Sequence, residues 1–282
     1  MNKPASTHDW NFDAAAVKAS ELANCCVTYG CEISTSSPLC RFQRFFAMLA
    51  QRSSGEWVLY KPGEAMSICH GAAMLHRLEQ IKQFLMPMGP QWRSKLQIAL
   101  GGSEVPAKPE QARDHMFELG IAAALRESGL SPEPAEPDIL VKLDGLTLGI
   151  ACKVLYSRKN VAKQISRARD QIVSSGRPGI IAIDISKLIH DHEHALQAAN
   201  QELATARMKS LARLTTTEFT RQFSRAEMEV QVLGWLVAHT TQSFADGVYA
   251  SLSECFPSTN RRALDPRNRY LRSLSQRLSG RY

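Results

Sequence analysis

The chain has 282 residues, of which 44% are hydrophobic, and it carries a formal net charge of +7. No apolar run approaches the ~18 residues needed to cross a bilayer, and the polar start lacks the apolar core of a secretory signal. Seven cysteines in a chain of this length do not indicate a disulfide scaffold. We therefore expect a soluble, cytoplasmic protein that makes no membrane contact.

Residues 1–100 read as short helices with a strand near residues 57–60, and residues 72–85 are an expected helix. Residues 101–109 are rich in turn-forming residues and read as a connector. This N-terminal region carries no motif with an assignable chemistry, so a role in specificity or partner docking is only an expectation.

A helix is expected over residues 114–129, where Glu118, Ile121, Ala122 and Leu125 recur at helical spacing. This spacing puts Glu118 on or beside the buried stripe, where an ionised carboxylate is costly unless it is paired or lies near a cation.

Two short apolar runs around Asp144-Gly145 predict a β-hairpin with a tight turn. The hairpin is entered through Pro137-Asp138 and left through Lys153. Because side chains alternate along a strand, Ala151 and Lys153 point to one face and Cys152 to the other, so the Cys152 thiol is expected in the core.

A second helix is expected over residues 160–175, followed by a buried strand over residues 180–185. Beside the apolar stripe of that helix, Gln164, Arg167 and Gln171 form a polar stripe.

The hairpin resembles the signature of the PD-(D/E)XK nucleases, the restriction-endonuclease-like superfamily, in which Pro-Asp and a hairpin precede an acid, any residue and a lysine. Pro137, Asp138 and Lys153 match that signature, whereas Ala151 stands where the family has its second acid. The order helix, hairpin, helix, strand over residues 110–190 is also the core order of the family. The resemblance implies a central mixed sheet flanked by helices, and Mg²⁺-dependent cleavage of DNA.

The resemblance also implies roles for single residues. Asp138 would be the principal ligand of Mg²⁺ (or Mn²⁺), with the backbone carbonyl of Cys152 and the Glu118 carboxylate as further ligands. Lys153 would orient or help deprotonate the attacking water and stabilise developing negative charge. Gln171 or Gln164 would take the place of a glutamine that often lies near the substrate. The alternatives are a Glu118 paired with a nearby base and glutamines on a solvated helix face.

Alanine at position 151 removes a negative charge and an oxygen next to the expected metal. Two explanations stay open: an inactivated variant of an active nuclease, or a natural protein that keeps the fold for binding. In both cases the chain as written is expected to cleave very poorly, and glutamate at position 151 distinguishes the two.

The positive charge is uneven. Residues 261–282 hold seven arginines against Asp265, a net charge of +6, and a second basic cluster follows Lys153. Arginine and lysine suit phosphate backbones, although an acidic protein partner or a solvated chain end are alternatives for the tail. The residues expected to contact nucleic acid are Lys159, Lys163, Gln164, Arg167, Arg261, Arg262 and Arg269.

The sequence thus predicts an α/β protein: an N-terminal α/β region (1–100), a restriction-endonuclease-like core (110–190), a helical region packed on it (191–260) and a basic tail (261–282). The expected function is that of a metal-dependent DNA endonuclease, in restriction or anti-phage defence beside a helicase or ATPase, in a form disabled at Ala151. This placement is an analogy from the fold. The alternative is a catalytically silent nucleic-acid-binding or scaffold subunit.

Overall fold

A computed structural model describes residues 11–52, 62–102, 111–189, 196–245, 248–258 and 265–278. The chain forms two compact units. The first comprises Met1–Met116, Asp191–Met208 and Thr241–Leu252, and the second comprises Phe117–His190, Lys209–Thr240 and Ser253–Tyr282. Among the described helices, none is both long and apolar enough to cross a membrane.

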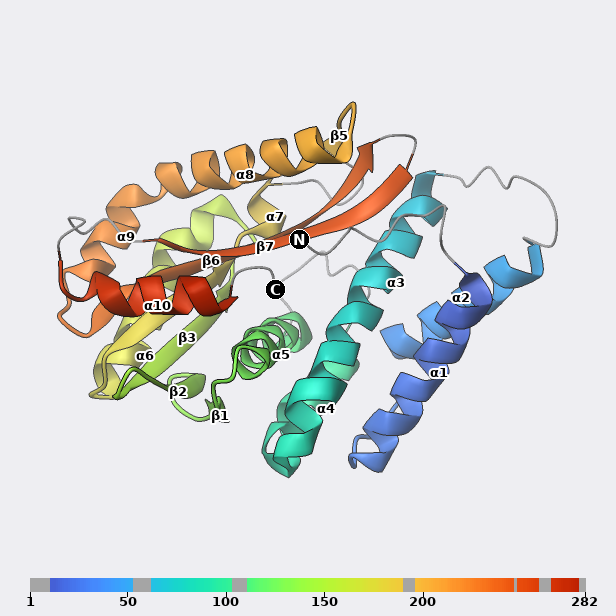
Figure 1. The fold of residues 1–282 in the computed structure, drawn as a ribbon, viewed down its shortest axis with the longest axis horizontal. Coiled ribbons are helices and arrows are strands. Elements are labelled where there is room, and N and C mark those ends of the chain that lie inside the picture. The colour runs from blue at the N-terminus through green and yellow to red at the C-terminus, as the bar shows by residue number, and fades with distance from the viewer. Residues whose placement is uncertain are drawn as a thin grey trace. The chain divides into compact units, whose positions relative to one another are not determined.

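The described N-terminal part of the first unit is helical (Figure 1). It contains α1 (Phe12–Thr28), α2 (Pro38–Arg52), α3 (Pro62–Gln80) with a π-helical extension η2 (Ile81–Leu85), two short turns η3 (Met86–Met88) and η4 (Pro90–Trp92), and α4 (Arg93–Leu100). The helix expected over residues 72–85 is therefore present, whereas the strand expected near residues 57–60 lies outside the described residues.

Burial raises the pKa of the Cys26 and Cys69 thiols to about 12, so both stay protonated at neutral pH.

The described strands form one mixed sheet. In chain order its strands are β1 (Glu133–Pro134), β2 (Ile139–Leu143), β3 (Leu146–Val154), β4 (Gly179–Asp184), β5 (Leu196–Gln197), β6 (Val232–Ala245) and β7 (Val248–Ser258). In space the order is β1-β2-β3-β4-β6-β5, with β7 paired to β6. The pairs β1–β2 and β2–β3 are antiparallel, and the pairs β3–β4, β4–β6 and β5–β6 are parallel. The described chain is therefore a mixed α/β protein.

The predicted hairpin is present as β2 and β3. Leu143 pairs with Leu146 across a two-residue turn in which Asp144 and Gly145 both have positive φ, of 49° and 80°. Glycine and aspartate tolerate this left-handed backbone, which matches the twist of the flanking strands. The turn therefore fixes the register that brings Pro137 and Asp138 beside the C-terminal half of β3.

Helices cover both faces of the sheet. α5 (Gln111–Glu127) precedes the hairpin, and α6 (Val161–Ser174) links β3 to β4 after a short turn, η5 (Arg158–Asn160). The apolar side chains of α6 pack against Ala151, Ile181 and Ile183, in one cluster with residues of α8 (Gln201–Glu218) and α9 (Thr220–Glu227). Within this cluster the rings of Phe223 and Trp235 are 4.1 Å apart. The short helix α7 (Ser186–Ile189) follows β4.

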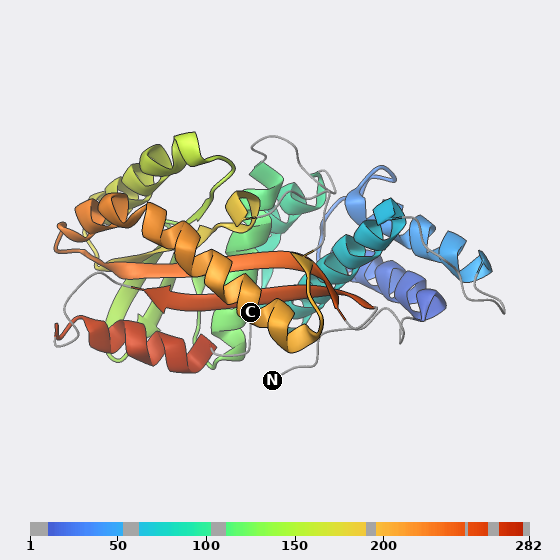
Figure 2. The same ribbon diagram turned by 90° about the horizontal axis from the view of Figure 1, so that it is seen from above.

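The other face of the sheet carries α10 (Asn268–Leu278). Gly234 on β6 pairs with Ile180, whose side chain points away from the face that Ile181 presents to α6. A Cβ atom on Gly234 would lie 2.5 Å from Leu271 Cδ1, so the glycine makes room for α10. Figure 2 shows the strands running between α6 on one side and α10 on the other.

One expectation for the C-terminal third is wrong. The region 191–260, which was expected to be helical, also contains β5, β6 and β7, so it is not purely helical. The run Val232–Ala238 is buried on both faces of the sheet, and such a run lacks the alternation that separates a strand from a buried helix. Part of the basic tail is also ordered, because α10 buries Leu271, Leu274 and Leu278.

Candidate active site

Asp138 stands at the entrance of β2, where the backbone of β3 holds its carboxylate. The buried Pro137 packs over Gly149, where a Cβ atom would lie 2.7 Å from Pro137 Cδ. Continuing the ladder from the pair Ile139–Ile150 places Asp138 opposite Ala151, on the same face. Asp138 Oδ2 accepts a hydrogen bond of 2.7 Å from the Cys152 backbone N–H.

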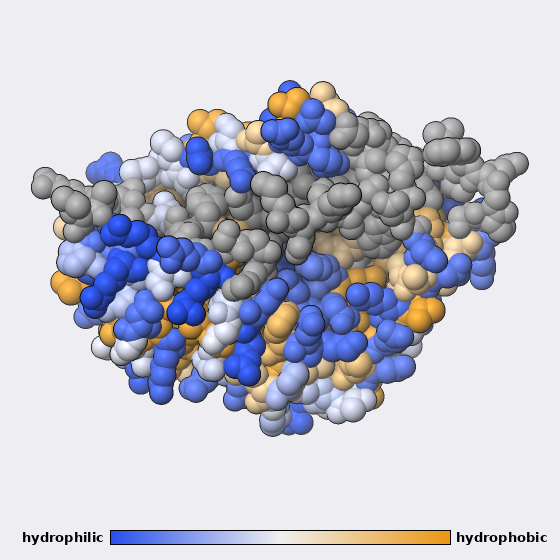
Figure 3. Space-filling view, viewed as in Figure 1, coloured by the Kyte–Doolittle hydropathy of each residue, from blue (hydrophilic) through white to orange (hydrophobic). Residues whose placement is uncertain are grey.

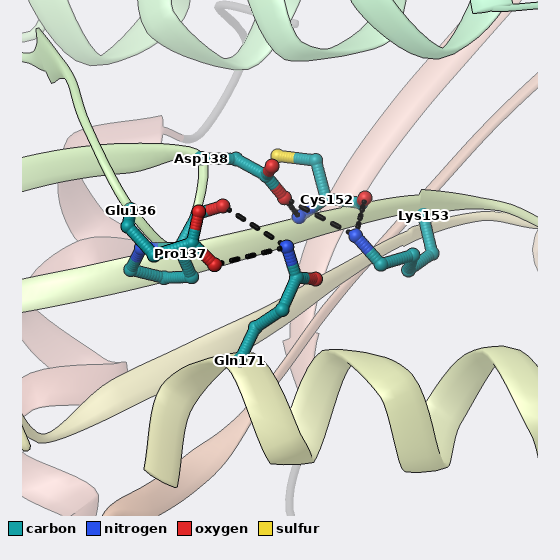
Figure 4. A network of polar contacts seen from close by, with 6 residues as sticks. All are labelled: Glu136, Pro137, Asp138, Cys152, Lys153 and Gln171. Carbon is teal, nitrogen blue, oxygen red and sulfur yellow. Dashed lines mark hydrogen bonds and ion pairs between the residues drawn. The ribbon is translucent and has the colours of Figure 1, made fainter. Parts of the chain in front are cut away.

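Lys153 turns its ammonium back toward the same carboxylate (Figure 4). Lys153 Nζ lies 3.3 Å from Asp138 Oδ2 and donates a 2.8 Å hydrogen bond to the Cys152 carbonyl oxygen. The side chains of Lys153 and Asp138 are only 17% and 14% exposed. Charges this far removed from water attract one another strongly and are costly to leave without a partner, so the two side chains hold each other in place.

Gln171 on α6 joins this group from the opposite side of the hairpin entrance (Figure 4). Its Nε2 donates to Pro137 O at 3.2 Å and to Glu136 Oε1 at 3.4 Å. Two acceptors fix the amide orientation, and the Gln171 Oε1 atom is then buried without a hydrogen-bond partner among the described residues. We call Asp138, Lys153, Gln171 and the Cys152 backbone the hairpin site.

Of the two glutamines that the sequence left open, Gln171 is the one that reaches the hairpin entrance. Glu136 is a member of this network that the sequence reasoning missed. The only signal for it was its position directly before Pro137. Its exposed carboxylate adds negative charge at the rim of the hairpin site.

Ala151 is fully buried and belongs to the apolar cluster beneath α6. Its methyl group points to the same face as Lys153, as the sequence predicted, and the register of the hairpin puts Asp138 on that face as well. A longer side chain at this position would extend between the apolar cluster and the hairpin site.

The residues present do not fit a Mg²⁺ ion. The two oxygens that the family resemblance assigns to the metal, Asp138 Oδ2 and Cys152 O, are both in contact with the Lys153 ammonium. The third expected oxygen donor, Glu118, is 5% exposed on α5 and has an interaction partner. Among the described residues, no group of three or more His, Cys, Asp or Glu side chains is placed to hold a metal. The Cys152 thiol is buried, as expected.

A row of basic side chains runs from η5 along α6 toward the hairpin site. Lys159, Lys163 and Arg167 are exposed and follow one another at a spacing of four residues, and Gln171 is the next member of that series. We call these three residues the α6 row. Gln164, also expected to contact nucleic acid, is half-buried on the same helix.

Of the tail residues expected to contact nucleic acid, the structure describes only Arg269, which does not belong to this face. Arg269 is exposed on α10 and lies over the Tyr270 ring, with 4.6 Å from its Cζ to the ring centroid. Figure 3 shows strongly hydrophilic atoms over the region in which α10 lies in Figure 1. Arg261 and Arg262 lie outside the described residues.

Comparisons of the chain with protein-family models, curated proteins and solved structures found no match.

Proposed function

We propose that this chain is a DNA-binding protein built on a PD-(D/E)XK-type nuclease core and that, with alanine at position 151, it cleaves DNA very poorly. One observation carries the proposal: Asp138 and Lys153, which the signature brings together, form a half-buried pair 3.3 Å apart at the entrance of the hairpin. The order helix, hairpin, helix, strand around that pair supports the same reading.

The chemistry of this site favours binding over cleavage. The Lys153 ammonium has three N–H donors, two of which point to Asp138 and Cys152 O, so one is left for a phosphate oxygen. Hydrolysis also needs an activated water and stabilisation of the negative charge that develops on the phosphate. Position 151 supplies no carboxylate for either task, so the bound phosphodiester stays intact.

The α6 row supports nucleic acid as the ligand. Its three exposed cations, Lys159 on η5 and Lys163 and Arg167 on α6, suit successive phosphates of a nucleic-acid backbone, and such contacts release counterions. Because these contacts do not read base edges, we expect affinity for DNA with little sequence preference.

The proposal is tested by titrating the full chain into a fluorescent DNA duplex and measuring anisotropy between 50 and 200 mM salt. About four phosphate contacts, one from each residue of the α6 row and one from Lys153, predict a loss of roughly 100-fold in affinity over that range. No binding at low salt, or binding that does not change with salt, would contradict the proposal.

A second candidate is an active metal-dependent endonuclease, in restriction or anti-phage defence beside a helicase or ATPase, in which position 151 normally carries an acid. It is favoured by the gathering of Asp138, Lys153 and Gln171 around the place where Ala151 stands. Restored Mg²⁺-dependent cleavage with glutamate at position 151 agrees with both candidates, because it shows that the missing acid limits cleavage. If the variant still only binds, the chain is a binding or scaffold subunit.

A further inference from the structure

The hairpin site carries a cation of its own. The Lys153 ammonium contacts the carboxylate of Asp138 and the carbonyl of Cys152, the same pair of oxygens that would otherwise face a divalent ion. Asp138 and Lys153 together have a net charge of zero, and Ala151 adds none. Two oxygens that are already bonded to an ammonium, in a group with no net charge, offer little to Mg²⁺ or Mn²⁺, so the ion and the ammonium compete for one place.

We infer that the Lys153 ammonium takes the place of a divalent metal ion in the hairpin site, so that the site holds a phosphate group without any metal. This inference deepens the proposed function, on which it rests only for the identity of the phosphate ligand. The competition between the ammonium and a metal ion follows from the contacts of Lys153 alone.

Three features of the structure agree with an ammonium in the place of the metal ion. Lys153 directly follows Cys152 in the chain, so its ammonium reaches the Cys152 carbonyl oxygen without any movement of a distant segment. Its side chain is only 17% exposed, which limits screening of its charge by water. The buried methyl group of Ala151 leaves no second carboxylate to draw the ammonium away from Asp138.

The inference predicts a graded response to changes in the charge of the site. Asp138, Lys153 and position 151 together are neutral in the chain as given, Lys153→Gln and Ala151→Glu each give them a charge of −1, and the double variant gives −2. The exposed Glu136 at the rim adds the same charge in every variant. Glutamine at position 153 keeps a polar side chain of similar reach while removing the charge. Each added negative charge should tighten Mn²⁺ binding by at least about tenfold, because the ion and these groups lie within a few ångströms of one another.

The test is a calorimetric titration of the full chain and its variants with Mn²⁺ alone. The wild-type chain should show no saturable binding below roughly 1 mM, Lys153→Gln should show one site, and the double variant should bind most tightly. Because Ala151 is buried and its glutamate variant can fail to fold, Lys153→Gln alone is sufficient for the test, after its thermal melt has confirmed a folded chain.

Two controls locate the effect. Lys142→Gln removes the exposed lysine of β2 and changes the overall charge equally, and it should leave Mn²⁺ binding unchanged. Adding Asp138→Asn to Lys153→Gln should abolish the gained site.

The inference is overturned if wild type binds Mn²⁺ as tightly as Lys153→Gln, or if a folded Lys153→Gln gains no site. DNA affinity measured in EDTA separates this inference from the proposed function. Affinity unchanged by EDTA supports both. A graded Mn²⁺ response without any DNA binding defeats only the proposed function, and DNA binding without the graded response defeats only the inference.

Discussion

Two basic helices cover opposite faces of one sheet, and their surroundings differ. α6 buries its apolar stripe against β3 and β4 and carries the α6 row, which leads to Gln171 and the hairpin site. α10 buries three leucines on the other face, and its Arg277 lies 3.9 Å from Asp144 at the hairpin turn. Both helices present positive charge, but only α6 presents it beside a half-buried ion pair. The position of a charge in the fold, more than the number of charges, therefore separates a binding face from a packing helix.

The largest effect is expected where α10 meets the sheet. In Gly234→Val the new side chain would collide with Leu271 and with the Ser258 carbonyl oxygen, which lies 2.9 Å from the position of the added Cβ atom. The backbone φ of Gly234 is also +153°, a value that favours glycine. We expect a loss of more than ~3 kcal/mol in the free energy of unfolding, measured with urea. Gly176→Ala is the control, since it also has positive φ but meets no atom within 4 Å, and it should cost only about 1 kcal/mol. Equal losses in the two variants would show that α10 does not depend on the space above Gly234.

The two ion pairs of the hairpin provide the next comparison. Asp138→Asn removes the partner of a Lys153 that is only 17% exposed, and it should cost about 1–3 kcal/mol of stability. Asp144→Asn breaks a pair with Arg277 whose side chains are 42% and 41% exposed, and it should cost less than ~1 kcal/mol. Thermal melts of both variants measure the difference. An equal cost at the two positions would mean that the Asp138–Lys153 pair is no more than a surface contact.

DNA affinity distinguishes the two basic helices directly. Neutralising Lys163 and Arg167 together should weaken binding about tenfold, or ~1.4 kcal/mol, and reduce the slope of log affinity against log salt by about two. Neutralising Arg269 and Arg272 on α10 removes the same charge and should change affinity by less than about threefold. A larger loss of affinity in the α10 variant than in the α6 variant would indicate that DNA binds the face covered by α10.

The smallest effect concerns the tether of the hairpin entrance. Gln171→Ala removes the hydrogen bonds to Glu136 and Pro137 O and should cost about 1 kcal/mol. Gln164→Ala on the same helix should stay within ~0.5 kcal/mol. Urea unfolding of the two variants measures both values. A larger loss in Gln164→Ala would mean that Gln164, and not Gln171, holds the hairpin entrance in place.

The parts of the fold with strong local signals were predictable. Asp144-Gly145 fixes the hairpin by turn chemistry, and the apolar stripe of α6 fixes that helix by its period. The meeting of Asp138 and Lys153 follows from the same register.

Other parts depended on contacts between distant residues. β6 pairs in parallel with β4 from far along the chain, and its run Val232–Ala238 carries no alternation, so it read as helical. The signal for α10 was present in Leu271, Leu274 and Leu278, spaced by three and four residues, but the seven arginines of the tail obscured it. The sequence could not show which of Gln171 and Gln164 lies near the hairpin entrance, because this depends on where α6 packs relative to Pro137. The turn of Lys153 onto Cys152 O had no local signal at all.

We propose that the hairpin site is of the nuclease type and that it lacks cleavage activity because position 151 carries no acid. Incubating plasmid and single-stranded DNA with Mg²⁺ and with wild type, Ala151→Glu, or Ala151→Glu combined with Asp138→Asn tests it most directly. We predict that Ala151→Glu cleaves at least ~100-fold faster than wild type and that Asp138→Asn abolishes the gain. A folded Ala151→Glu variant that still cleaves no faster than wild type, or a wild-type chain that already cleaves well, would contradict the claim.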